Sequence, residues 1–267
     1  MKTFRILTSA LGAIAVLAAA LIVAGTGIVD YLPQVTLGIL IVFFFSAASN
    51  TLNDYIDRES DKKNHPERPI PSGKLKPKTA LIAALFIFLL ALAGSWFINM
   101  ICFSLVALAF VIELAYEFLF KKFAGIGNFV IGFQTALAYI FGSYIIGESK
   151  AVIILAVLSF FAVVGREIIK DIEDVKGDKY KKTIPRKIGI KKARLLSSFF
   201  ILLPVALSFL PYYFGLFSWY YLPTVVAADL IFIYAVIIQL KNPKKSRKIA
   251  KGAMFVALFA FLIGAFT

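Results

Sequence analysis

Long apolar runs recur along almost the entire chain, and they restrict the fold more than any other feature of the sequence. A helix that crosses a bilayer needs about 20 mainly apolar residues, and its backbone polar groups must be satisfied internally. The runs that meet this requirement are residues 6–29, 33–52, 79–98, 100–120, 125–147, 151–169, 193–214, 218–240 and 249–266. The sequence therefore predicts an all-α bundle of about nine transmembrane helices.

The composition agrees with a chain that is largely solvated by lipid. Hydrophobic residues make up 60% of the 267 residues and charged residues 16%, whereas soluble domains contain about 25% charged residues. The first apolar run is longer than the ~7–15 residues of a signal-peptide core, so we interpret it as a retained span. Because no polar linker divides the chain, we expect residues 1–267 to form one transmembrane domain.

The basic residues are confined to short loops between the apolar runs, although the formal net charge is +14. This distribution argues against nucleic acid as a partner and favours a role in topology and in contact with anionic lipid. If the N-terminus is cytoplasmic, alternate loops place every Lys and Arg except Lys150 on the cytoplasmic side. We therefore predict a multi-pass protein of the cell membrane whose two long polar loops, residues 53–78 and 170–192, face the cytoplasm.

Each of these two loops opens with three Asp residues in the spacing D-x-x-D-x-x-x-D. The residues are Asp54, Asp57 and Asp61 in the first motif and Asp171, Asp174 and Asp178 in the second. On a helix that extends from the preceding span, this spacing places three mutually repelling carboxylates on one face. A single motif of this kind would be explained by a solvated acidic rim that pairs with nearby Lys and Arg side chains. Its repetition favours a shared cation.

The residue types around the motifs indicate which cation this is. Hard oxygen ligands without neighbouring His or Cys select Mg²⁺ or Ca²⁺, and Mg²⁺ characteristically binds through a few carboxylates together with substrate phosphates. The motifs therefore predict a diphosphate held by Mg²⁺ between two carboxylate clusters. The candidate metal ligands that follow from the motifs are Asp54, Asp57, Asp61, Asp171, Asp174 and Asp178.

The stretch 53–61 is similar to the N-D-x-x-D-x-x-x-D motif of the UbiA superfamily of intramembrane prenyltransferases, and the stretch 68–73 (RPIPSG) is similar to the segment that follows it there. With the second motif and the series of spans, the resemblance covers nearly the whole chain. It implies that Asn53 joins the six Asp residues as a metal ligand, and that Asp54, Asp57, Asp171 and Asp174 are catalytic. The stretch 165–178 most resembles the archaeal digeranylgeranylglyceryl phosphate synthases. This resemblance implies transfer of a geranylgeranyl group from geranylgeranyl diphosphate to the free hydroxyl of geranylgeranylglyceryl phosphate, which forms the second ether bond of archaeal membrane lipids.

The resemblance and the position of basic and aromatic residues near the motifs suggest a set of substrate contacts. The predicted substrate-binding residues are Arg68, Tyr116, Lys121, Lys122, Tyr139, Arg166 and Lys170. The family often has Tyr-x-x-x-Lys after the fourth span, whereas Tyr116 and Lys121 are five positions apart here. Glu113, Glu117 and Asp229 lie within apolar runs, where ionisable residues are costly, and no role is assigned to them.

Two other functions remain open at this point. An aromatic prenyltransferase of the quinone pathway belongs to the same superfamily and would use the same donor chemistry. A divalent-cation transporter would also contain repeated carboxylate motifs, although its site would be expected near the middle of the membrane. The motifs specify a diphosphate donor and a metal, whereas the acceptor follows from the resemblance and the oligomeric state is not specified.

Overall fold

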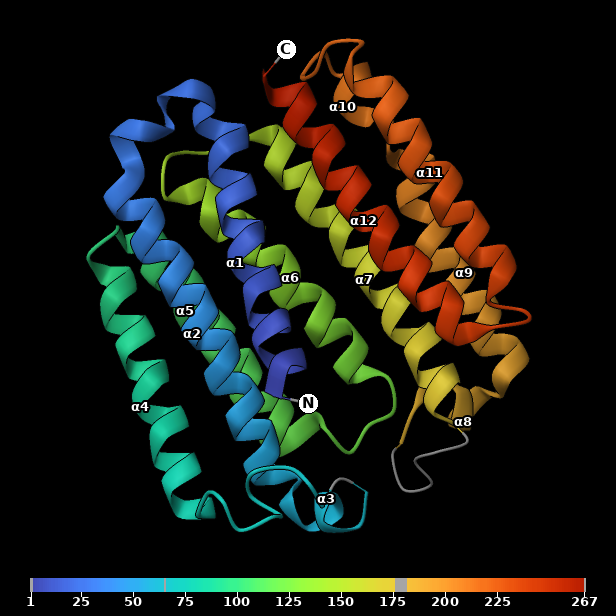
Figure 1. Cartoon of the computed structure of the whole chain (residues 1–267). Coiled ribbons are helices and arrows are strands. Elements are labelled where there is room, and N and C mark those ends of the chain that lie inside the picture. The colour runs from blue at the N-terminus through green and yellow to red at the C-terminus, as the bar shows by residue number, and fades with distance from the viewer. Residues whose placement is uncertain (1, 65, 176–181, 267) are drawn as a thin grey trace.

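The computed structural model describes residues 2–64, 66–175 and 182–266, and the regular structure within them is entirely helical (Figure 1). The long helices are α1 (Lys2–Ala24), α2 (Leu32–Ile56), α4 (Pro77–Trp96), α5 (Met100–Ala115), α6 (Ile126–Tyr144), α7 (Lys150–Asp174), α9 (Ile190–Leu207), α11 (Tyr221–Ile238) and α12 (Pro243–Phe266). The short elements are η1 (Gly25–Tyr31), α3 (Arg58–Asn64), η2 (Tyr116–Phe120), α8 (Ile184–Ile188) and α10 (Leu210–Tyr213). The predicted all-α class is confirmed.

Eight helical stretches in the described part of the chain are long and apolar enough to cross a membrane. The first, residues 9–56, contains α1, the 3₁₀ helix η1 and α2. The chain reverses direction at η1, so that α1 and α2 lie side by side (Figure 1). The protein is therefore a polytopic membrane protein, and the number of complete crossings and the side of the N-terminus stay predictions.

Local signals explain why two adjacent apolar runs form separate helices. Asn99 caps α5, because its side chain accepts a 2.8 Å hydrogen bond from the backbone N–H of Cys102, and side chains of this type stabilise helix N-termini. The Asn99 amide also donates to the carbonyl oxygen of Tyr144 at 2.8 Å. One side chain thus begins α5 and connects it to the end of α6.

The last helix begins earlier than the apolar run predicts. Helix α12 starts at Pro243, and the Asn242 side chain accepts a 2.9 Å hydrogen bond from the N–H of Lys245. Proline is well tolerated at a helix start because its missing N–H would have no helical partner there. The expected start at Ile249 is therefore wrong, and Arg247 lies on a helix instead of in a loop.

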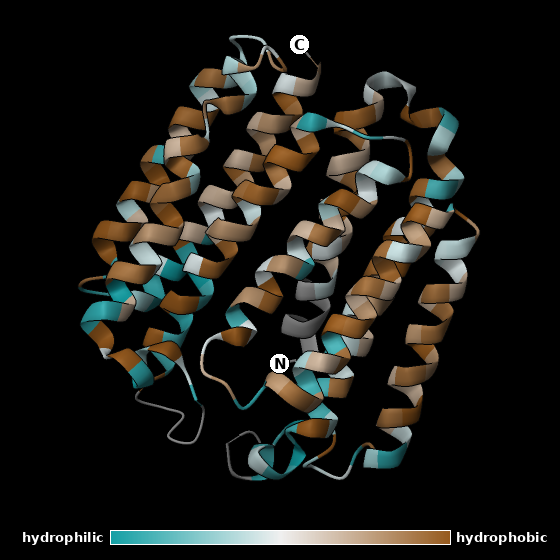
Figure 2. Cartoon of the chain, turned by 180° about the vertical axis from the view of Figure 1, so that it is seen from behind, coloured by the Kyte–Doolittle hydropathy of each residue, from teal (hydrophilic) through white to brown (hydrophobic). Residues whose placement is uncertain are grey.

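Helix α7 occupies the centre of the bundle, where it packs against α6, α9 and α12. It has the largest share of buried residues of the candidate spans. The connections that follow α2, η2 and α11, together with the end of α7 and the helix α8, lie at the same end of the molecule as the start of α1, the lower end in Figure 1. Figure 2 shows that hydrophilic residues gather toward this end. We call it the motif end, because both Asp motifs begin there.

Candidate active site

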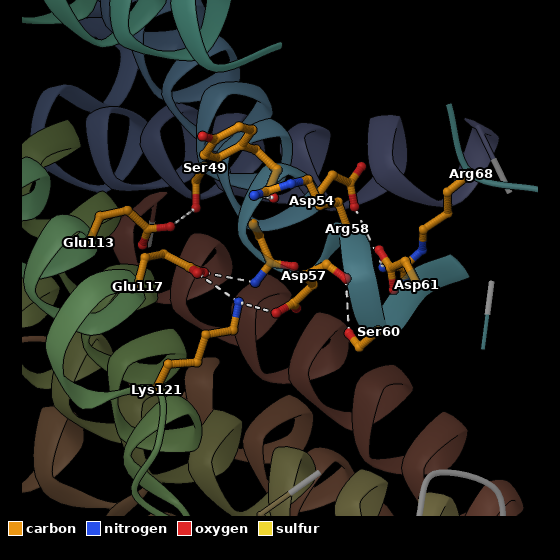
Figure 3. Close-up of polar contacts among 12 residues, drawn as sticks. Ser49, Asp54, Asp57, Arg58, Ser60, Asp61, Arg68, Glu113, Glu117 and Lys121 are labelled. Carbon is orange, nitrogen blue, oxygen red and sulfur yellow. Dashed lines mark hydrogen bonds and ion pairs between the residues drawn. The ribbon is translucent and has the colours of Figure 1, made fainter. Parts of the chain in front are cut away.

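The first Asp motif continues the helical path of α2. The N–H of Asp57 donates to the carbonyl oxygen of Asn53 at 2.9 Å, and the N–H of Asp61 donates to the carbonyl oxygen of Asp57 at 2.8 Å. Asp54 and Asp61 share one cation, because Arg68 Nη1 lies 3.5 Å from Asp54 Oδ1 and 2.5 Å from Asp61 Oδ2 (Figure 3). The sequence motif is thus a compact carboxylate cluster that is partly neutralised by Arg68.

A second cation enters this cluster from η2. Lys121 Nζ lies 2.9 Å from Asp57 Oδ1 and 2.6 Å from Glu117 Oε2 (Figure 3). The amide of Asn53 donates to Glu117 Oε1 at 2.7 Å. Glu117, whose side chain is buried, therefore joins the first motif to η2. The position of Glu117 within an apolar run indicates a buried carboxylate, but it does not indicate that Asn53 and Lys121 are its partners.

The five-residue spacing of Tyr116 and Lys121 has a structural explanation. Residues 116–120 form a π-helix, and the N–H of Lys121 donates to the carbonyl oxygen of Tyr116 at 2.8 Å. A π-helix is closed by i→i+5 hydrogen bonds and often occurs as a single turn at functional sites. Tyr116 and Lys121 are therefore one helical turn apart, as they would be with four-residue spacing in an α-helix.

The second Asp motif lies at the end of α7. Asp171 is buried and accepts a 2.9 Å hydrogen bond from the amide of Asn128, which belongs to α6. Asp174 is the last residue of α7, whereas Asp178 lies outside the described residues. The sequence interpretation missed Asn128, although a carboxamide near the start of an apolar run is a recognisable signal of a buried polar contact.

Arg166 and Lys170 are both paired with one carboxylate of α7. Arg166 Nη2 lies 2.6 Å from Glu167 Oε1, and Lys170 Nζ lies 3.1 Å from Glu167 Oε2. Glu167 is buried, so that the two cations compensate a charge that would be costly alone. Arg166, Glu167 and Lys170 therefore form one ion-pair group at the end of α7 that borders the second motif.

One cavity of about 1800 Å³ connects the two motifs. Drug-sized ligands occupy pockets of roughly 300–1,000 Å³, so this cavity has room for a larger ligand or for two. Its wall includes residues of both motifs and every predicted substrate-binding residue, whereas Asp54 is not one of the wall residues. These wall residues are Asn53, Asp57, Asp61, Asp171 and Asp174, together with Arg68, Tyr116, Lys121, Lys122, Tyr139, Arg166 and Lys170.

The cavity becomes mainly apolar away from the motif end, and its wall reaches Val225 on α11 and Phe261 on α12. The three carboxylates to which the sequence assigned no role, Glu113, Glu117 and Asp229, all lie on its wall, and two of them are paired with a serine. Ser49 donates to Glu113, and Ser208 donates to Asp229 at 2.7 Å. The charged part of the cavity is therefore continuous with a deep lipid-like interior.

The donor set that faces the cavity matches the chemistry of Mg²⁺. Within residues 2–64, 66–175 and 182–266, no group of three or more His, Cys, Asp or Glu side chains is close enough to form a ready metal cage. Mg²⁺ does not require one, because it usually keeps several waters and binds through one or two carboxylates plus substrate phosphates. Asp57 and Asp174 supply oxygen ligands to the same cavity, and the set fits a metal held jointly with a phosphorylated substrate.

Comparison with known proteins identifies the family. A digeranylgeranylglyceryl phosphate synthase from Methanosarcina mazei is 41% identical over 231 residues, which cover 84% of this chain and 80% of that protein. A solved structure of digeranylgeranylglyceryl phosphate synthase has 33% identity and a TM-score of 0.83, and covers 100% of this chain and 99% of its own. A UbiA homolog from Archaeoglobus fulgidus, solved with GPP and Mg²⁺, has the same fold at 20% identity, with a TM-score of 0.75 and coverage of 98% and 99%. The UbiA prenyltransferase family model matches residues 13–259, and the chain therefore belongs to this family.

Proposed function

We propose that this protein transfers a geranylgeranyl group from geranylgeranyl diphosphate to the free hydroxyl of geranylgeranylglyceryl phosphate in a Mg²⁺-dependent reaction. The observation that carries the proposal is the single cavity that joins two oxygen-rich Asp motifs to an apolar interior. Such a cavity holds a diphosphate at its charged end and a prenyl chain in its depth. The names of the relatives that match most of the chain support the same reaction.

The donor diphosphate occupies the space between the two motifs. Asp57 and Asp174 face it as carboxylates, and Arg68 and Lys121 stand beside the first motif as cations that hydrogen-bond phosphate oxygens. Bound Mg²⁺ would be held by the motif residues and would neutralise the charge that develops on the departing diphosphate. Asn53 and Asn128 orient carboxylates of the site, because Asn53 donates an amide hydrogen bond to Glu117 and Asn128 donates one to Asp171.

The reaction breaks the bond between C1 of the prenyl chain and the diphosphate oxygen, and forms an ether bond between C1 and the glycerol oxygen. The hydroxyl proton passes to an oxygen base. Water would compete for the cation-like C1, so that a deep apolar pocket favours transfer over hydrolysis. Tyr139 is buried on the cavity wall and offers an aromatic ring that is able to shield positive charge.

The position of the motifs favours this function over the alternatives. A transport site would be expected near the middle of the membrane, whereas the Asp motifs lie at one end of the bundle (Figure 1). A quinone-pathway prenyltransferase would share the donor site, but the relatives that match this chain over most of its length are named as enzymes of the glycerolipid acceptor.

We further propose that the active site opens to the cytoplasm. Lys and Arg in short loops are retained on the cytoplasmic side of membrane proteins. Within the described residues, the loops after α2, η2 and α11 that contain Lys and Arg lie at the motif end, whereas Lys150 begins α7 at the opposite end (Figure 1). Cysteine labelling checks this orientation: a cysteine at position 74 should react only with reagents that reach the cytoplasm, and a cysteine at position 148 only with external reagents.

The decisive test is product analysis by mass spectrometry. Purified protein is incubated with geranylgeranyl diphosphate and Mg²⁺, in parallel with geranylgeranylglyceryl phosphate and with an aromatic acid. The expected product is digeranylgeranylglyceryl phosphate alone. A prenylated aromatic product would show that the acceptor is an aromatic acid and not the proposed glycerolipid. If the folded protein forms no prenylated product with either acceptor, the proposed reaction is refuted.

A further inference from the structure

A group of cations on the side of the cavity formed by α7 and α12 is not explained by the donor site. It consists of Arg166 and Lys170 on α7 and of Arg247, Lys248 and Lys251 on α12, and all five line the cavity. We call it the α7–α12 basic cluster. The two helices pack side by side, and Arg247 Nε lies 2.8 Å from Glu173 Oε2, which fixes their relative position at this level.

The cluster contains more positive than negative charge. Glu167 pairs with both Arg166 and Lys170 but neutralises only one of these two charges, and Glu173 neutralises the charge of Arg247. Among the side chains that the structure describes, no carboxylate lies within ion-pair distance of Lys248 or Lys251. Lys251 is only partly exposed and lines the same cavity as Arg166 and Arg247. Like charges gathered in a cavity are costly, and a bound anion would relieve this cost.

The distance along α7 matches the dimensions of the proposed acceptor. Glycerol has three carbons, so that the attacking hydroxyl is at most two carbons away from the phosphate-bearing carbon. Lys170 precedes Asp174 by one helical turn, and a helix rises about 1.5 Å per residue. An anion beside Lys170 therefore lies on the order of 6 Å along the helix from Asp174, the motif residue on the cavity wall that is assigned to the donor. This spacing suits a phosphate whose glycerol reaches the donor C1.

We propose that the α7–α12 basic cluster binds the phosphate of the acceptor. This inference rests on the proposed function and names the residues that would make the enzyme select a phosphorylated acceptor. A phosphate monoester carries a charge of about −1.5 to −2 at neutral pH, which would offset most of the positive charge that the two carboxylates leave on the cluster. The donor diphosphate is held by the Asp motifs, and the acceptor phosphate thus has a separate site.

The first test measures steady-state kinetics of Lys251→Ala and Lys248→Ala. We expect KM for geranylgeranylglyceryl phosphate to rise about 10-fold or more in Lys251→Ala, since hydrogen bonds to charged groups are strong, while KM for geranylgeranyl diphosphate is unchanged. Lys251→Arg should restore most of the acceptor affinity. The matched control is Lys244→Ala, because Lys244 lies on the same helix, is exposed and is outside the cavity wall.

The second test replaces the acceptor by geranylgeranylglycerol, which lacks the phosphate. The unmodified enzyme should prefer the phosphorylated acceptor. In Lys251→Ala most of this preference should disappear, because kcat/KM should fall for the phosphorylated acceptor and stay unchanged for geranylgeranylglycerol. An equal fall in kcat/KM for both acceptors would mean that Lys251 has only a structural role. That outcome would overturn the inference while leaving the proposed function in place.

A bilayer phospholipid is the other source of a phosphate group for this cluster. Activity is therefore measured in vesicles of phosphatidylcholine and in vesicles that also contain phosphatidylglycerol. The inference predicts the same change of acceptor KM in both. A defect of Lys251→Ala that occurs only with phosphatidylglycerol would assign the cluster to membrane lipid and overturn the inference. If the unmodified protein forms no ether product with either acceptor, the proposed function fails as well.

Discussion

The amide of Asn128 donates a 2.9 Å hydrogen bond to Asp171 and so joins α6 to the second Asp motif. A hydrogen bond to a charged group contributes about 1.5–3 kcal/mol, which corresponds to roughly 10- to 100-fold in rate. We expect Asn128→Ala to lower kcat/KM by about this factor. The control is Gln134→Ala, another cavity residue of α6, whose amide donates to the backbone of Ala109. Equal losses in the two variants would contradict a specific role for Asn128.

Asp57 and Asp174 represent the two motifs on the cavity wall. Replacing either by Ala should reduce kcat by at least about 100-fold, which is the effect of removing one preorganised electrostatic contact to a transition state. The protein should remain folded and inserted, because Lys121 keeps Glu117 as a partner in Asp57→Ala. The control is Glu59→Ala, since Glu59 is exposed and pairs with Lys62. Near-normal turnover by either Asp variant would exclude a two-motif mechanism.

Metal binding should depend on the diphosphate, because the described residues contain no cage of three or more close ligands. Mg²⁺ alone is expected to bind weakly and to bind more tightly when an unreactive prenyl diphosphate analogue is present. Calorimetric titration of Mg²⁺ with and without the analogue measures this difference, and Asp174→Ala should remove it. Tight binding of Mg²⁺ to the substrate-free protein would contradict the prediction.

The π-helix at residues 116–120 should tolerate the loss of one residue. Deleting Leu119, which is exposed, gives the sequence a Tyr-x-x-x-Lys spacing, and an α-helical turn would then hold Lys121 where the π turn holds it. We expect donor KM and kcat close to those of the unmodified protein. Deleting the equally exposed Val111 is the control, because it rotates Tyr116, Glu117 and Lys121 together away from the first motif. Loss of activity in the Leu119 deletion alone would refute this explanation.

The sequence predicts the parts of this site that depend on local geometry. The spacing of Asp54, Asp57 and Asp61 indicates one helical face, and the backbone of the motif is helical. Apolar runs of membrane length predict the long helices, because lipid requires internal backbone hydrogen bonding. The single domain that we expect over the whole chain stays a prediction, as do the roles of the individual site residues.

Contacts between helices are not encoded in such local patterns. No spacing in the sequence indicates that Asn128 faces Asp171, or that Glu117 lies between Asn53 and Lys121. The start of α12 was also placed too late, since the apolar run begins at Ile249 whereas Asn242 and Pro243 begin the helix. Because of this error, the sequence did not indicate that Arg247 lies on a helix and lines the cavity. The contacts between helices that complete the site are therefore known only from the tertiary structure and not from the periodicity of the sequence.

The central position of α7 has a consequence for how the two substrates are aligned. Lys170, on the proposed acceptor side, and Asp171 and Asp174, on the donor side, stand on the same continuous helix. Movements that bring α2 or α12 closer to α7 would open or close either half of the cavity without altering the separation of these residues. The spacing between the α7 residues of the acceptor side and those of the donor side is therefore set by one helix and not by the packing of two.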